Sequence, residues 1–146
     1  MDFGENLTGR QNSTEYFDTV IGHIEDIVIG EEFQNMANQF MDCYYHLFEA
    51  GEENKIVYTE VYQKYTSLVE TFIVKNLNRR MSYFDMDLFA LELETKKNQL
   101  DGEIFELLYT LTDFLAFKEM MLDYKIFKEG RYDDLDQGFS VTSLQQ

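Results

Sequence analysis

The chain has 146 residues and a mass of 17.4 kDa, a size that fits one folded domain with one hydrophobic core. Hydrophobic residues make up 45% of it, including 13 Phe and 10 Tyr, which excludes a disordered protein, and its interspersed charges exclude a membrane span. The 28 acidic and 12 basic residues give a net charge of −16, which disfavours binding to nucleic acid or to anionic lipid.

The single cysteine, Cys43, cannot form an internal disulfide, and the first residues lack the basic start and apolar run of a secretory signal. We therefore expect a reducing, intracellular compartment. The absence of Pro and of strand-like alternation favours helices. The predicted fold class is all-α, a single-domain bundle of about six helices.

The first predicted elements are a flexible N-terminal arm over residues 1–13 and a helix that follows it. Gly and small polar residues dominate the arm, and Ser13 or Thr14 can cap the helix. Gly30 is expected to end this helix. Its core-facing stripe is expected to contain the apolar residues at three- and four-residue spacing: Phe17, Val20, Ile21, Ile24, Ile27 and Val28.

Two longer amphipathic segments follow. Glu31 and Glu32 suit a positive helix N-terminus, and the second helix is predicted to run to Gly51. The third is predicted over about Tyr58 to Arg80, where basic residues suit a helix C-terminus.

The remaining helices are predicted from caps and apolar runs. Asp85 can cap a fourth helix that ends before Gly102. The apolar run 103–128 is long enough for two helices, split near Thr112 and Asp113, with Asp113 capping the second. The predicted domain therefore spans residues 14–130, and residues 131–146 are predicted to form a loose tail, acidic and then polar.

Motifs of catalysis and of metal or cofactor binding are missing from the sequence. Only His23 and His46 are present, neither in a Glu-x-x-His pair, and no Cys-x-x-Cys, dinucleotide or phosphate-loop pattern occurs. Cys43 and His46 are helix neighbours, but a catalytic thiol also needs an oxyanion site. We therefore predict no enzyme, no catalytic residue, no metal and no cofactor. A small helical enzyme or metal protein, the rival class, would need titratable ligands clustered inside the bundle.

The predicted helices carry more apolar and aromatic residues than one core-facing stripe on each helix can hold. A second stripe suggests a groove for a partner's amphipathic helix, while a thick six-helix core that buries every one of these residues is the alternative. Acidic side chains beside the groove are candidates for its rim, or for ordinary solvated surface: Asp42, Glu52 and Glu53. The predicted cleft residues are Met41, Tyr45, Phe48, Tyr65, Leu68, Phe72, Phe114 and Phe117.

Three stretches resemble signature segments of the BART domain family: FMDCYYHLFE, EENKIVYTEVYQKYTSLVE and TDFLAFKEMMLDYKIFKEGR. The resemblance covers about residues 15–131. It implies a six-helix effector of an Arf-like small GTPase, which takes the GTPase's N-terminal amphipathic helix into a hydrophobic cleft when GTP is bound. A second contact with the switch region would make binding depend on GTP.

The resemblance also implies further partners and several locations. The partners are an adenine nucleotide carrier and a STAT-family transcription factor whose nuclear retention would be affected. The implied locations are cytoplasmic, with pools at the centrosome or cilium basal body, in the mitochondrial intermembrane space and in the nucleus. We expect a monomer. The alternative function is a constitutive acidic helical adaptor whose binding does not depend on nucleotide.

Overall fold

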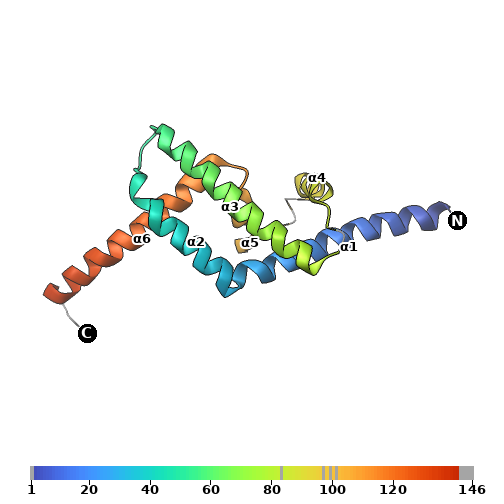
Figure 1. Cartoon of the computed structure of the whole chain (residues 1–146), viewed down its shortest axis with the longest axis horizontal. Helices are drawn as coiled ribbons and strands as arrows, with labels where there is room; N and C mark the ends of the chain where they lie inside the picture. The colour runs from blue at the N-terminus through green and yellow to red at the C-terminus, as the bar shows by residue number, and fades with distance from the viewer. Residues whose placement is uncertain (1, 83, 97, 99, 101, 142–146) are drawn as a thin grey trace. The chain divides into compact units, whose positions relative to one another are not determined.

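The computed structural model describes the backbone of residues 2–82, 84–96, 98, 100 and 102–141, and the side chains among residues 15–130 of these. These residues form six α-helices, one short 3-10 helix and no strand, so the predicted all-α class is confirmed (Figure 1). None of the described helices is both long and apolar enough to cross a bilayer. The elements are α1 (Asp2–Ile29), α2 (Glu31–Tyr44), η1 (Tyr45–Leu47), α3 (Ile56–Arg80), α4 (Met86–Lys96), α5 (Gly102–Thr110) and α6 (Phe114–Val141).

Several helix boundaries follow from local chemistry and confirm the predicted signals. The Asp85 carboxylate accepts a hydrogen bond from the Leu88 N–H at 3.1 Å and caps α4. The Asp113 carboxylate accepts one from the Ala116 N–H at 3.0 Å and caps α6. At the C-terminus of α1, the Gly30 N–H donates a hydrogen bond to the Ile27 carbonyl at 3.2 Å, and the helix ends there as predicted.

The predicted end of the second helix at Gly51 is wrong. The α-helix ends at Tyr44, and η1 carries the chain to Leu47. Phe48 then adopts an extended backbone (φ −93°, ψ 137°) and is fully buried, so the chain turns to place this ring in the core. Gly51 lies in the following loop with φ +128°, a conformation that a residue with a Cβ rarely adopts.

The helices at the two ends of the chain are longer than the sequence suggests. α1 begins at Asp2 rather than at Ser13 or Thr14, and α6 continues past Gly130 to Val141. The side chains of residues 1–13 and 131–146 lie outside those that the structure describes. The predicted arm, domain and tail stay predictions.

The helices form two compact units. Unit 1 consists of the chain up to Asn35 together with Ser67–Leu108, and unit 2 of Met36–Thr66 together with the chain from Tyr109 onward. Both α2 and α3 therefore contribute residues to each unit.

Unit 1 has a core in which one apolar stripe of α1 is central. The predicted stripe is confirmed for five residues, all buried: Phe17, Val20, Ile21, Ile24 and Ile27. The Phe17 ring stacks on Phe89 of α4 with ring centroids 5.7 Å apart. The Tyr16 hydroxyl accepts a hydrogen bond from the Asp85 N–H at 2.8 Å and ties α1 to the start of α4.

Unit 2 has a core of stacked aromatic rings. Phe48 stacks on Tyr58 with centroids 4.5 Å apart, and Phe117 lies 5.7 Å from Phe48 and 4.7 Å from Tyr65. The Tyr65 hydroxyl is hydrogen-bonded to the Thr110 hydroxyl at 2.8 Å in the interior. This cluster connects Phe48, directly after η1, to α3, α5 and α6.

Candidate protein-binding surface

Three of the eight predicted cleft residues lie inside the aromatic core of unit 2. Phe48 and Phe117 have no exposed area, and Tyr65 is 4% exposed. Burial raises the pKa of the Tyr65 phenol, against the hydrogen bond with Thr110, which lowers it. These rings can contact a partner only if unit 2 opens. In this conformation they are core residues that pack beneath the partly exposed side chains of unit 2.

Three other predicted cleft residues are partly exposed in unit 2: Met41, Tyr45 and Phe114. The Tyr45 ring meets Tyr124 of α6 edge to face with centroids 5.7 Å apart. The Phe114 ring meets Tyr62 of α3 edge to face at 5.6 Å. Neighbouring rings thus hold Tyr45 and Phe114 in place while part of each remains accessible, as a docking surface requires.

The last two predicted cleft residues, Leu68 and Phe72, are partly exposed on the half of α3 that belongs to unit 1. The buried face of α3 takes members from both of the stripes that the sequence suggested: Val61, Tyr65, Val69, Ile73 and Leu77. The eight residues are divided between two units, and their assignment to one cleft stays a prediction.

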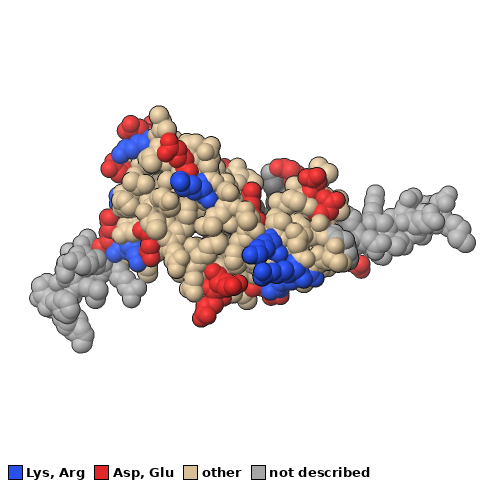
Figure 2. Space-filling model, viewed as in Figure 1, with Lys and Arg blue, Asp and Glu red and all other residues tan. Residues whose placement is uncertain are grey.

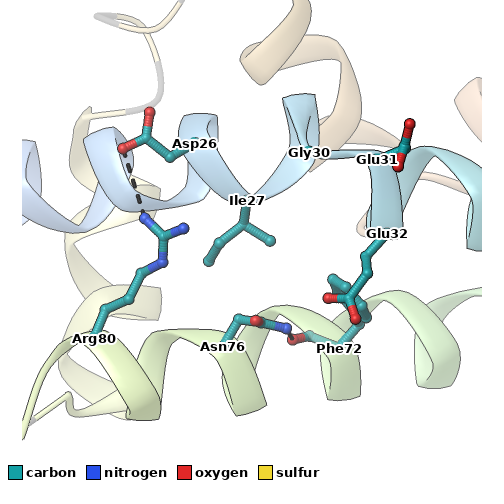
Figure 3. Close-up of a pocket in the computed structure, with 8 residues that line it drawn as sticks. All are labelled: Asp26, Ile27, Gly30, Glu31, Glu32, Phe72, Asn76 and Arg80. Carbon is teal, nitrogen blue, oxygen red and sulfur yellow. Dashed lines mark hydrogen bonds and ion pairs between the residues drawn. The ribbon is translucent and has the colours of Figure 1, made fainter.

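A hollow of about 290 Å³ lies beside Phe72 in unit 1 (Figure 3). On one side of the hollow, the Arg80 guanidinium pairs with the Asp26 carboxylate at 3.6 Å. On another, the Asn76 amide donates to the Phe72 carbonyl at 2.9 Å. The lining residues are Asp26, Ile27, Gly30, Glu31, Glu32, Phe72, Asn76 and Arg80.

Asp42, a predicted rim residue, links α2 to α6. Its carboxylate accepts a hydrogen bond from the Tyr124 hydroxyl and pairs with Lys128 Nζ at 3.2 Å. The Tyr124 hydrogen bond, followed by the contributions of Lys128, lowers the pKa of Asp42 against the opposing effect of burial. Burial first, and then the Asp42 carboxylate, raises the pKa of Tyr124 to about 12. The carboxylate therefore has a structural partner on each side.

The loop between η1 and α3 carries the other two predicted rim residues, Glu52 and Glu53, both exposed. Lys118 of α6, only 6% exposed, holds this loop: its Nζ donates to the Gly51 carbonyl at 2.8 Å. The same amine donates to the Asn54 side chain at 2.7 Å and to the Glu53 carbonyl at 3.3 Å.

A second lysine of α6 holds the start of the same loop. Lys125 Nζ donates to the Phe48 carbonyl at 2.8 Å. Because Lys118 and Lys125 satisfy backbone oxygens of the loop, its acidic side chains are displayed from a fixed backbone. Lys118 is not among the residues predicted from the sequence; the available signal was a cation between Phe117 and Met121 in the most apolar run of the chain.

Apolar residues of α4 form a further exposed surface, which contains none of the predicted cleft residues. Met86 and Leu88 are 43% and 42% exposed, and Leu91 is 68% exposed, while Phe89 is buried. Outside this helix, Ile126 and Phe127 of α6 are also exposed. In α4 only Phe89 and Glu92 are buried, so most of its apolar residues face outward. The spacing of apolar residues along the sequence does not show which of them are buried.

Charged and metal-ligating side chains are spread over the described surface. On the face drawn in Figure 2, acidic side chains lie in separate groups, some of which have basic side chains beside them. Cys43 is exposed with a free thiol. Within the described part of the chain, no three or more His, Cys, Asp or Glu side chains gather where they could hold a metal ion.

Comparison with known proteins identifies the family of this helical chain. Residues 16–130 match a family model described as "The ARF-like 2 binding protein BART". The chain belongs to the BART family. The predicted resemblance is thereby confirmed over all of the described helices except the outer parts of α1 and α6.

BART relatives with similar sequences are found in several vertebrates, each named ADP-ribosylation factor-like protein 2-binding protein. The Xenopus laevis protein is 51% identical over 128 residues, which are 88% of this chain and 82% of that protein. The Homo sapiens protein is 50% identical over 138 residues, 94% and 85% of the two chains. The Gallus gallus protein is 45% identical over 130 residues, which are 89% of this chain and 83% of that protein. The family is thus one of binding proteins, in line with the predicted binding role.

Proposed function

We propose that this BART chain is an effector that binds an Arf-like small GTPase in its GTP-bound state. In this proposal the chain takes the GTPase's N-terminal amphipathic helix into an apolar cleft and contacts its switch region. The observation that carries the proposal is the family match over residues 16–130, together with relatives 45% to 51% identical that are named for binding ADP-ribosylation factor-like protein 2.

The partly exposed apolar side chains support a helix as the bound element. An amphipathic helix binds a groove through apolar anchors spaced three and four residues apart. Met41, Tyr45 and Phe114 offer such contacts in unit 2, and Leu68 and Phe72 do so in unit 1. The thioether of Met41 adapts to the shape of a bound side chain, which suits a groove lining.

The direct test is a binding measurement with the purified GTPase in two nucleotide states. We expect tight binding to the GTPase loaded with a non-hydrolysable GTP analogue, weak binding to the GDP form, and a large loss when the GTPase's N-terminal helix is deleted. Equal binding in all of these states would support the constitutive adaptor instead.

Met41→Arg tests the cleft itself. A cation forced into an apolar contact with no partner should weaken GTPase binding by about 2 kcal/mol, or roughly thirtyfold. Gln39→Arg is the matched control, since Gln39 is exposed on the same helix and the change adds the same charge. Helicity by circular dichroism should be unchanged in both. Normal binding by Met41→Arg would remove Met41 from the cleft, and loss of helicity would make it a core residue.

The cellular roles implied by the family form part of the same proposal. They comprise nuclear retention of a STAT-family factor, an interaction with an adenine nucleotide carrier, and pools in the cytoplasm, nucleus and mitochondrial intermembrane space and at the ciliary base. Imaging of tagged wild-type chain beside Met41→Arg checks them. If these roles depend on the GTPase, the variant should lose them and Gln39→Arg should keep them.

A further inference from the structure

We propose that the hollow in unit 1 binds one lysine or arginine side chain carried by the amphipathic helix of the GTPase. This inference rests on the proposed function and adds to it a specificity contact outside the apolar cleft. It follows from the shape of the hollow, from the balance of charge around it, and from the direction of one carboxylate.

The hollow combines an apolar surface with enough room for a long side chain. Ile27, which is 5% exposed, points from α1 toward α3, and Phe72 lies across from it (Figure 3). The volume of about 290 Å³ far exceeds the roughly 10–15 Å³ that one water occupies on this measure. Lysine and arginine bury their methylene stems along such apolar surfaces and leave the charged group at a polar edge.

The charge around the hollow favours a cation. Three acidic residues and one arginine line it, and the Arg80 guanidinium already pairs with the Asp26 carboxylate at 3.6 Å. Glu31 and Glu32 make no ion pair with any residue that the structure describes. The Asn76 amide nitrogen donates to the Phe72 carbonyl, which leaves the amide oxygen as an acceptor at the same hollow. An anionic guest would meet this excess of carboxylates, whereas a cationic one would be stabilised by it.

The direction of Glu32 separates a binding role from an ordinary role at a helix start. Acidic residues in the first turn of a helix are stabilised by its dipole, and this accounts for Glu31 and Glu32 equally. Their side chains nevertheless differ: the Glu32 carboxylate reaches down toward α3, and the Glu31 carboxylate points away from it (Figure 3). Only Glu32 is placed to meet a group inserted between α2 and α3.

The position of Phe72 connects the hollow to the GTPase helix. Phe72 is one of the predicted cleft residues and also lines the hollow, so a helix that packs its apolar face on this ring lies beside Glu32. Amphipathic helices that associate with membranes carry lysine and arginine on their polar face. A basic residue at the edge of the apolar face is therefore the group that such a helix would bring to the hollow.

Glu32→Gln and Glu31→Gln provide a matched test, because each removes one negative charge from the same helix turn. We expect Glu32→Gln to weaken binding of the GTP-loaded GTPase about threefold at low salt and less at high salt, since partly exposed ion pairs are screened. Glu31→Gln should change the affinity by much less. Thermal midpoints of both variants report any shared effect on helix stability.

A double-mutant cycle then identifies the partner residue. Each lysine and arginine of the GTPase helix is replaced by Gln in turn, and its coupling to Glu32→Gln is measured. One position should couple with Glu32 and not with Glu31. Equal effects of the two Glu variants, or coupling at no position, would overturn the inference while leaving the effector function intact. Failure of the wild-type chain to bind the GTP-loaded GTPase would overturn both.

Discussion

The two units are stabilised by different kinds of core. Unit 1 relies on a mostly aliphatic stripe of α1, in which Val20, Ile21, Ile24 and Ile27 are buried beside the single ring of Phe17. Unit 2 relies on four rings that touch one another and on Lys118, a buried amine bound to three oxygens. Side chains that share neighbours depend on one another, so losses in unit 2 should propagate further than losses in unit 1.

The largest expected effect comes from removing the ring at the centre of unit 2. Phe117 lies within 6 Å of three other rings and is fully buried, so Phe117→Ala should reduce the free energy of unfolding by about 4 kcal/mol. Ile24→Ala, at an equally buried position of unit 1, should cost about 3 kcal/mol. Urea denaturation followed by tyrosine fluorescence measures both. A greater loss for Ile24→Ala would contradict the difference between the two cores.

Lys118→Met should have the next largest effect, about 2 kcal/mol, on the stability of unit 2. Methionine keeps the apolar stem but leaves the Gly51 and Glu53 carbonyls and the Asn54 side chain without their charged donor. The thermal midpoint and amide exchange of the loop between η1 and α3 are the measurements. Lys64→Met is the control, since it removes the same charge from an exposed site of α3 and should change stability by less than about 0.5 kcal/mol.

The loop that Lys118 and Lys125 hold shows which features the sequence could not predict. The stripe of α1 and the caps at Asp85 and Asp113 depend on residues within four positions of one another, so spacing and residue type were enough. The end of α2 could not be found in this way. It depends on burial of Phe48, whose carbonyl is bound by Lys125, 77 residues further along the chain.

The same reasoning applies to the predicted cleft. Periodicity showed that α2 and α3 have more apolar residues than one stripe, and partly exposed Met41 and Phe72 agree with that surplus. Periodicity could not show which residues become core, because that depends on which helix packs against each face. Phe48, Tyr65 and Phe117 are buried for this reason. The hollow and the opposite directions of Glu31 and Glu32 are likewise properties of packing, not of spacing.

The smallest expected effect concerns Asp42, whose side chain is 48% exposed. Because Tyr124 and Lys128 lower the pKa of Asp42 in the folded state, the carboxylate contributes stability above its ordinary pKa of about 4, and this is lost as the pH falls through the folded value. Asp42→Asn should thus cost less than about 1 kcal/mol at pH 7, with the difference from wild type shrinking below about pH 4. Asp123→Asn removes the same charge from α6 without touching this pair, and denaturation across pH compares the two.

The stability that Tyr124 contributes should fall as the pH rises, whereas that of Asp42 falls as the pH drops. Tyr124 therefore provides a second test of the contact between these two residues. Its pKa rises to about 12, above the ordinary value of about 10, so the unfolded chain loses the phenol proton first. The stability that Tyr124 contributes is present below about pH 10 and is lost as the pH approaches 12. Tyr124→Phe should remove this loss, and Asp42→Asn should reduce but not abolish it, because burial is the larger cause of the shift. If Asp42→Asn abolished it, the carboxylate and not burial would be the dominant cause.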